Sequence, residues 1–135
     1  MTGSSTWTNA GELARTGEGQ GFSGMLYTET GQVPWMQIAA AAIAAPSLTF
    51  TTGIAVAFPR SPMVSAQVAW ELASETNGKF RLGLGSQVKG HVVRRYSSDF
   101  DKPARRLLDY VLAVKACFRA FRGEERLKHE GDFYN

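Results

Sequence analysis

The chain has 135 residues, of which 44% are hydrophobic and 20% charged, and its formal net charge is +3. These values are ordinary for a globular protein and exclude a disordered or fibrous chain. The modest charge does not by itself indicate nucleic-acid binding. The single cysteine, Cys117, excludes an intrachain disulfide and a zinc site built from several cysteines.

The N-terminal residues 1–10 are rich in Ser, Thr and Gly, and we expect them to be frayed. They lack the basic and apolar regions of a secretory signal. The most apolar stretch, residues 38–45, is far shorter than the ~20 residues that a membrane span needs. We therefore expect a cytoplasmic protein without a membrane partner.

Strands and helices alternate along the first part of the chain. A short helix is expected over residues 11–20, followed by a strand over 22–28 and a helix over 34–45 that Pro34 opens and Pro46 ends. A Thr-, Ile- and Val-rich strand is predicted over 48–57.

The next helix, predicted over residues 61–77, begins with Ser61 as N-cap and Pro62 in the first turn. Val64, Val68 and Leu72 repeat every four residues and predict its buried stripe. Asn77 and Gly78 both tolerate positive φ, so the helix is expected to end there.

The last part of the chain is predicted as a strand over 80–84, a long loop, and a helix over 103–122. The apolar side chains of this helix recur at intervals of three and four residues and predict one continuous apolar face: Leu107, Val111, Val114, Phe118 and Phe121. The strands read as apolar runs buried on both faces, which is typical of a parallel sheet in an α/β fold. The pattern alone leaves open a doubly wound sheet or part of a barrel.

Ligands in such folds bind at the carboxyl ends of the strands. The glycine-rich turn over residues 83–90 follows a strand, but Val88 stands where a dinucleotide fingerprint needs its third glycine. His91 likewise follows Gly90 where a P-loop needs lysine. The turn therefore predicts only a close approach of a ligand to the backbone.

The most basic part of the chain follows this turn and contains Lys89, His91, Arg94, Arg95, Lys102, Arg105 and Arg106. Two interpretations stay open: a site for a phosphate or an anionic cofactor tail, and a solvated surface. Nucleic-acid binding is not expected, since Tyr96 and Phe100 are the only interleaved aromatic residues.

Other residues whose side chains could act in catalysis or metal binding give weaker indications of a site. Glu29 follows a predicted strand and could serve a polar site, although an isolated carboxylate there is expected to be exposed. No metal site is expected, because His91 and His129 are far apart without metal-ligand spacing. Cys117, one residue before Phe118, is expected to be a packing residue rather than a nucleophile.

Several segments resemble luciferase-like monooxygenases and F420-dependent reductases. Residues 21–30 (GFSGMLYTET) are similar to the second strand of that family, 52–55 and 60–62 to its third strand and loop, and 78–85 (GKFRLGLG) to its fourth strand. The long helix and residues 130–134 (EGDFY) also match. The resemblance implies that residues 11–135 form the N-terminal half of a (β/α)8 TIM barrel, roughly its first four βα units with parallel strands.

By this resemblance the chain carries part of a site for F420, or alternatively FMN. The matching cofactor-binding positions are Gly53, Ile54, Ala55, Ala57, Gly85, Ser86 and Gln87. Family members often have a non-proline cis peptide at the third strand, which corresponds here to Gly53–Ile54. Glu29 and Thr30 take the places of an Asp-His pair and are the catalytic candidates, although Thr30 cannot transfer protons as histidine does.

The function that the resemblance implies is hydride transfer by a fragment of an F420- or FMN-dependent oxidoreductase acting on a small molecule. An alternative is a non-catalytic, truncated α/β module that associates through exposed strand faces, and another is a small anion-binding protein. Half a barrel leaves apolar strand faces and a sheet edge open. We therefore expect a homodimer or association with a complementary half-barrel.

Overall fold

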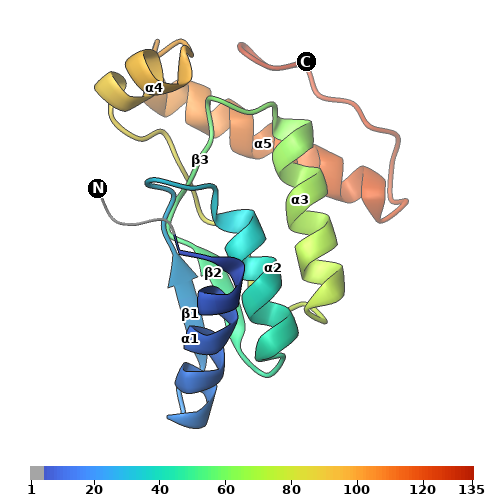
Figure 1. The fold of residues 1–135 in the computed structure, drawn as a ribbon. Helices are drawn as coiled ribbons and strands as arrows, with labels where there is room; N and C mark the ends of the chain where they lie inside the picture. The colour runs from blue at the N-terminus through green and yellow to red at the C-terminus, as the bar shows by residue number, and fades with distance from the viewer. Residues whose placement is uncertain (1–4) are drawn as a thin grey trace. The chain divides into compact units, whose positions relative to one another are not determined.

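The structure is a computed structural model that describes residues 5–135. The chain divides into two compact units (Figure 1). Unit 1 consists of the residues up to Ala55 together with Glu71–Gly83, and unit 2 consists of Val56–Trp70 and Leu84–Asn135.

Unit 1 is built on a parallel sheet of three strands, β1 (Gly24–Tyr27), β2 (Thr49–Thr52) and β4 (Phe80–Arg81), in the order β1-β2-β4. Met25 is in register with Phe50, and Phe50 with Phe80. The parallel direction arises because a helix separates each strand from the next along the chain. The predicted parallel α/β arrangement is confirmed here.

Only one face of this sheet is covered. Phe50 is fully buried and Tyr27 nearly so, whereas Leu26, which points to the opposite face, is 61% exposed. The prediction that the strands are buried on both faces is therefore wrong for the face that carries Leu26, where Thr51 is half-buried and Arg81 is exposed.

Two helices of unit 1, α1 (Trp7–Gly19) and α2 (Pro34–Ala44), pack side by side next to β1 and β2 (Figure 1). Gly11 permits the close approach, since a Cβ there would lie 3.2 Å from the Cβ of Ala44. α2 has Pro34 at its first position, as predicted.

α1 begins earlier than the sequence indicates. The Thr6 hydroxyl accepts a hydrogen bond from Asn9 N at 3.1 Å and so caps the helix, which starts at Trp7 rather than at residue 11. The frayed segment predicted over residues 1–10 is therefore helical from Trp7 onward. Residues 1–4 lie outside the described part.

Two predicted strands are each broken into two. The stretch 48–57 contains β2 and then β3 (Ala55–Val56). The stretch 80–84 contains β4 and the first residue of β5 (Leu84–Gly85), which pairs with β3. The peptide bond between β2 and β3, Gly53–Ile54, is cis, as expected.

The helix α3 (Pro62–Glu75) starts as predicted, with Ser61 Oγ accepting from Val64 N at 3.2 Å. The buried side chains of α3 lie about one residue further along the helix than the predicted stripe. Val64 is 46% exposed, whereas Ser65, Ala66 and Ala69 are buried. Leu72 is the one position of the predicted stripe that is buried, because small residues occupy the rest of the contact side.

The long helix of unit 2, α5 (Pro103–Phe121), also begins at its proline as predicted. Of its predicted apolar face, Val114 is buried and the other members are half-buried. The fully buried side chains form a neighbouring stripe that includes Tyr110, Ala113 and Cys117. The burial of Cys117 confirms its packing role.

The predicted loop between residues 85 and 102 contains a further helix, α4 (Lys89–Tyr96). It is short and carries Gly90, and only Val92 is buried, so it lacks the apolar periodicity that predicts helices. No helix among residues 5–135 combines the length and apolarity needed to cross a membrane.

Candidate functional site

The chain segments that follow the strands of unit 1 meet through backbone hydrogen bonds. Gly53 N donates to Tyr27 O at 2.8 Å, and Glu29 N donates to Ile54 O at 3.3 Å. Ala55 N donates to Gly83 O at 2.8 Å. The catalytic candidate Glu29 and the predicted cofactor-binding residues Gly53, Ile54 and Ala55 are thereby brought together.

A buried side chain fixes this arrangement. Thr52, 2% exposed, donates from Oγ1 to Gly83 O at 2.8 Å, and the same oxygen accepts from Gly83 N at 2.8 Å. Position 83 has no room for a side chain, since a Cβ there would lie 2.0 Å from Thr52 O. The hydroxyl thus joins the end of β2 to the segment that follows β4.

The two catalytic candidates differ in their surroundings. The expectation that Glu29 is an exposed carboxylate is wrong: the residue is 4% exposed. The backbone amide of Glu29 donates a hydrogen bond to Ile54 O, which holds this residue against the segment that follows β2. Thr30, by contrast, is exposed to solvent.

An apolar platform lies beside these strand ends, formed by Leu26, Gly53 and Ile54. Leu26 is 61% exposed, and Gly53 and Ile54 are half-buried. The Leu26 side chain lies directly against Gly53, where a Cβ would approach it to 2.6 Å. Sequence reasoning missed Leu26, because it reads as one residue of a buried apolar strand.

The remaining predicted cofactor-binding residues lie in unit 2. Ala57 N donates to Gly85 O at 2.9 Å, which joins the end of β3 to β5. Gly85, Ser86 and Gln87 are half-buried, and Gln87 has a φ of 59°. Ala57 is fully buried, as is Ala55 in unit 1, so the side chains of these two positions belong to the core.

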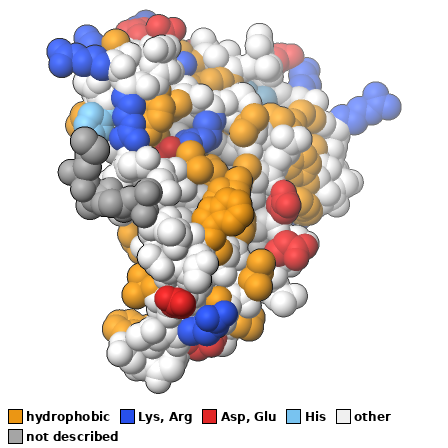
Figure 2. Space-filling model, viewed as in Figure 1, with side chains coloured by type: hydrophobic (Ala, Val, Ile, Leu, Met, Phe, Trp, Pro, Cys, Tyr) orange, Lys and Arg blue, Asp and Glu red, His pale blue; other side chains and the backbone are white. Residues whose placement is uncertain are grey.

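The basic region predicted from the sequence separates into two groups in unit 2. Arg105 pairs with Asp132 at 2.6 Å, and Arg106 donates to Tyr134 Oη at 3.0 Å and lies 4.9 Å from the Phe58 ring centre. These two arginines hold the C-terminal segment in place. The cations of α4 are exposed, and Figure 2 shows Lys and Arg side chains over this helix.

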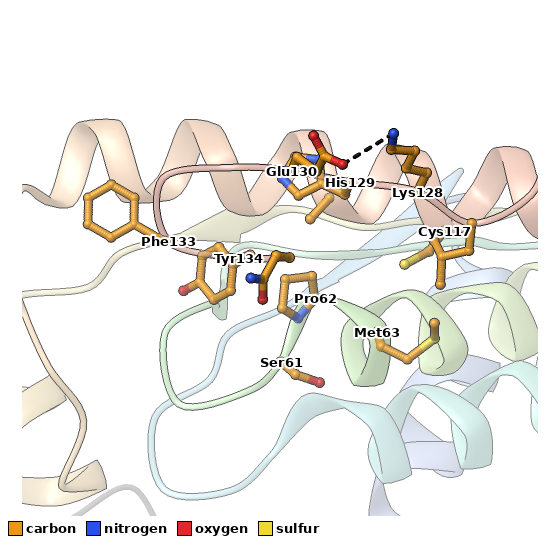
Figure 3. Close-up of a pocket in the computed structure, with 12 residues that line it drawn as sticks. Ser61, Pro62, Met63, Cys117, Lys128, His129, Glu130, Phe133 and Tyr134 are labelled. Atoms are coloured by element: carbon orange, nitrogen blue, oxygen red, sulfur yellow. Dashed lines mark ion pairs between the residues drawn. The ribbon is translucent and has the colours of Figure 1, made fainter.

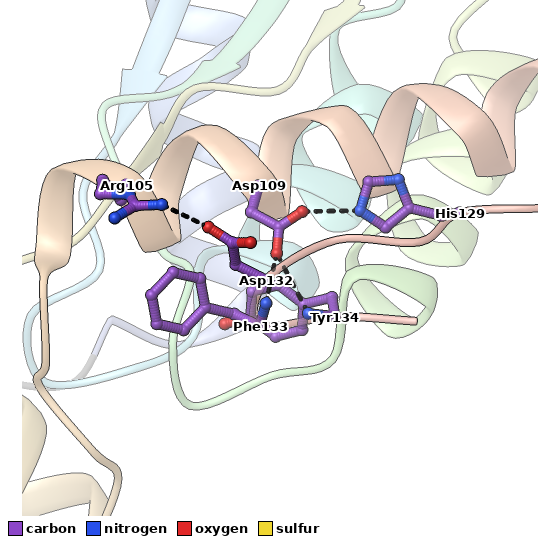
Figure 4. A network of polar contacts seen from close by, with 6 residues as sticks. All are labelled: Arg105, Asp109, His129, Asp132, Phe133 and Tyr134. Carbon is purple, nitrogen blue, oxygen red and sulfur yellow. Dashed lines mark hydrogen bonds and ion pairs between the residues drawn. The ribbon is translucent and has the colours of Figure 1, made fainter.

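Asp109 of α5 also contacts the C-terminal segment, residues 124–135, at three places (Figure 4). Asp109 accepts hydrogen bonds from Phe133 N at 2.7 Å and Tyr134 N at 3.1 Å, and His129 Nε2 lies 2.7 Å from its other oxygen. Burial acts to raise the pKa of Asp109, but these hydrogen bonds outweigh it and hold the pKa below its usual range.

A cavity of about 550 Å³ lies in unit 2 between α5, the start of α3 and the C-terminal segment (Figure 3). Its lining is mainly apolar and includes Pro62, Met63, Cys117 and Leu127, with His129 at the side. Burial raises the pKa of the Cys117 thiol, which keeps it protonated and unreactive near neutral pH. Within residues 5–135, no three potential metal ligands of the His, Cys, Asp and Glu types lie together.

The whole chain, residues 1–135, matches the family model described as luciferase-like monooxygenase. The chain belongs to the luciferase-like monooxygenase family. It is 37% identical over 125 residues to the uncharacterized proteins Rv1360 of Mycobacterium tuberculosis and Mb1395 of Mycobacterium bovis. The match covers 93% of this chain and 37% of each relative, so the chain spans well under half of their length.

Two solved structures share its fold. The monooxygenase RslO1 from Streptomyces bottropensis superimposes with a TM-score of 0.80 at 21% identity, over 95% of this chain and 40% of that chain. The oxygenating constituent of 3,6-diketocamphane monooxygenase from Pseudomonas putida, a type II Baeyer–Villiger monooxygenase solved with FMN, gives 0.75 at 20% identity, over 98% and 39%. The fold is thus that of about 40% of a luciferase-like TIM barrel, as predicted.

Proposed function

We propose that the strand ends of this chain form part of the cofactor site of an oxidoreductase that acts on a small molecule. The cofactor is a flavin-type ring system, F420 or FMN. The proposal rests on membership of the luciferase-like family together with the geometry of unit 1, where the carboxyl ends of parallel strands converge.

The observation that carries the proposal is the apolar platform of Leu26, Gly53 and Ile54. An exposed leucine beside a residue without a side chain offers a flat apolar surface, which suits one face of a planar aromatic ring. The backbone of Glu29, a buried residue, is joined to this surface by the hydrogen bond from its amide to Ile54 O. These residues therefore fit the proposed group.

When bound, such a cofactor supplies the hydride or electron transfer of the reaction. The chain's own residues would bind and orient the ring: Leu26 and Ile54 by apolar contact, and Gly53 by leaving room for the Leu26 side chain. Thr30 is exposed and cannot act as an acid or base near neutral pH, so Glu29 is the one catalytic candidate of the pair that could hold a proton.

Different observations favour each of the two cofactors. F420 is favoured by the likeness of residues 87–91 (QVKGH) and 94–96 (RRY) to an F420-dependent subgroup of the family. FMN is favoured by the Pseudomonas putida protein, which shares the fold and was solved with FMN. Both ring systems are flat and present the same apolar face to the platform.

A binding titration tests the proposal. The purified chain is titrated into FMN and into F420, and ring fluorescence is followed to saturation. Gly53→Ala places a methyl group into the Leu26 side chain and displaces it from the platform, so we expect about tenfold weaker binding, as for the loss of ~1.4 kcal/mol of contact energy.

Gly17→Ala is the matched control, because a Cβ at this helical position of α1 meets nothing within 4 Å. Its affinity should equal that of the parent chain. Absence of saturable binding of either cofactor, or equal affinity in the Gly53→Ala and Gly17→Ala variants, would refute the role of the platform.

A further inference from the structure

The proposed cofactor site shares no residue with the cavity of about 550 Å³ in unit 2. The residues that line this cavity come from three segments of that one unit: the start of α3, the middle of α5, and residues 127–135. Cavities that hold small organic ligands measure about 300–1,000 Å³ and combine an apolar wall with a few polar groups. The volume therefore suits a ligand of roughly one or two rings.

Sulfur-containing and aromatic side chains form much of the cavity wall. Met63 at the start of α3 and Cys117 of α5 contribute the sulfur atoms, and Phe133 and Tyr134 contribute the rings (Figure 3). Sulfur atoms are polarisable and make favourable contacts with aromatic rings, and aromatic side chains pack edge-to-face or offset against another ring. The wall therefore favours an aromatic ligand over an aliphatic one.

The charged side chains that line the cavity pair with each other. Lys128 Nζ lies 3.2 Å from Glu130 Oε1, and both side chains are 77% exposed (Figure 3). Their opposite charges cancel, and solvent screens what remains. The wall therefore favours neither a cation nor an anion, and we expect an uncharged ligand.

His129 gives the wall a hydrogen-bond acceptor. Its Nε2 lies 2.7 Å from Asp109 Oδ1 (Figure 4). Asp109, whose pKa lies below its usual range, is ionised near neutral pH, and a carboxylate can only accept hydrogen bonds. Nε2 of His129 therefore carries the proton and donates it, which leaves Nδ1 of the neutral ring as an acceptor.

This acceptor is accessible. The bond to Asp109 is the one hydrogen bond that the His129 ring makes within residues 5–135, so Nδ1 has no partner there. In the same part of the chain, no buried side-chain nitrogen or oxygen lacks a partner. Nδ1 is therefore not buried, and His129 is one of the residues that line the cavity.

We propose that this cavity binds a small, uncharged aromatic alcohol of the phenol class. The ring lies among Met63, Cys117 and Phe133, and the hydroxyl donates a hydrogen bond to Nδ1 of His129. All of these residues belong to unit 2, so the proposal does not depend on the cofactor site of unit 1.

The test compares 2-naphthol with 2-methoxynaphthalene, which has the same ring system but no hydroxyl hydrogen to donate. The full chain is titrated with each compound near neutral pH, and the fluorescence of the compound is followed to saturation. We expect both to bind, with 2-naphthol the tighter. The ratio of the two dissociation constants reports the hydrogen bond, because contacts of the ring enter both constants alike.

His129→Leu removes the acceptor and keeps an apolar side chain at this position. The ratio should change about tenfold, through weaker 2-naphthol binding alone, since one hydrogen bond is lost. His91→Leu is the matched control: it makes the same change at an exposed histidine of α4 that does not line the cavity. The ratio in this variant should equal that of the parent chain.

Cys117 provides a second readout that needs no substitution and therefore holds even where a variant fails to fold. It is the single cysteine of the chain, so its alkylation by iodoacetamide in mildly alkaline solution reports on the cavity wall. With 2-naphthol at about ten times its dissociation constant, the alkylation rate should fall about tenfold, since only the unoccupied fraction reacts.

Three results would overturn the proposal. The first is the absence of saturable 2-naphthol binding, and the second is an alkylation rate of Cys117 that saturating 2-naphthol leaves unchanged. The third is an equal loss of both compounds in His129→Leu, which would show that His129 only supports the wall and does not bind the hydroxyl. None of these results bears on flavin or F420 binding in unit 1.

Discussion

At the scale of single residues, Asp109 makes the contacts that hold the C-terminal segment on α5. Its carboxylate receives two backbone amides and His129, and Gly131 passes so close that a Cβ there would lie 1.9 Å from Asp109 Oδ1. Sequence reasoning missed this residue, because an aspartate within a helix usually faces solvent and its partners are 20 to 25 positions away.

The lowered pKa of Asp109 predicts how stability depends on pH. An aspartate with a depressed pKa in the folded state stabilises the fold above its unfolded pKa of about 3.9, and this contribution is lost as the pH falls through the folded pKa. Asp109→Asn should lower the free energy of unfolding at pH 7 by about 1.5–3 kcal/mol and flatten the acid limb of the stability curve.

The measurement is urea denaturation between pH 2 and pH 7, with Asp132→Asn as control. Asp132 is an exposed carboxylate paired with Arg105, so its loss should cost less than about 1 kcal/mol. An acid limb that is equally steep in the parent chain and in Asp109→Asn would contradict the assignment.

At the scale of elements, hydrogen bonds between distant residues decide where the strands break. The sequence predicts single strands over 48–57 and 80–84, whereas the structure divides each at Thr52 and Gly83. The two residues are 31 positions apart, and their contact is made by a hydroxyl that both donates and accepts. No periodicity of apolar residues contains this information.

Thr52→Val should therefore destabilise unit 1. Valine has the shape of threonine but leaves the amide and carbonyl of Gly83 without this buried partner, which should lower the free energy of unfolding by about 1–3 kcal/mol. Chemical denaturation measures the change.

The neighbouring Thr51→Val is the control for strand propensity. Thr51 is half-buried, and its hydroxyl donates to Arg81 O at 3.1 Å, so the loss there should stay below about 1 kcal/mol. A Thr52→Val variant as stable as Thr51→Val would show that the Thr52–Gly83 contact contributes little.

At the scale of the whole molecule, the chain spans 37% to 40% of the relatives and solved structures that it matches. The sheet β1-β2-β4 has one open face, with Leu26 61% exposed. Apolar side chains reach the surface at several further places (Figure 2). We propose that a second copy or a complementary half-barrel covers the open sheet face.

Sedimentation of the purified chain tests this proposal. We expect a weight-average mass above the 14.7 kDa of one chain that rises with protein concentration. Leu26→Lys should lower the association, because it places a charge on the open face. Leu13→Lys, which makes the same change at a position of α1 that is 59% exposed, should not. A monodisperse monomer at every concentration would contradict association with a second copy.

The sequence by itself determined the starts of α2, α3 and α5, the α/β class and the family. Pro34, Ser61 and Pro103 act on backbone groups within one turn, so their effect can be read locally. Only the tertiary structure decided the burial of Glu29 and the helical state of α4. Both depend on contacts with residues far along the chain, such as Ile54 O for Glu29 and Phe58 O for the segment after α4.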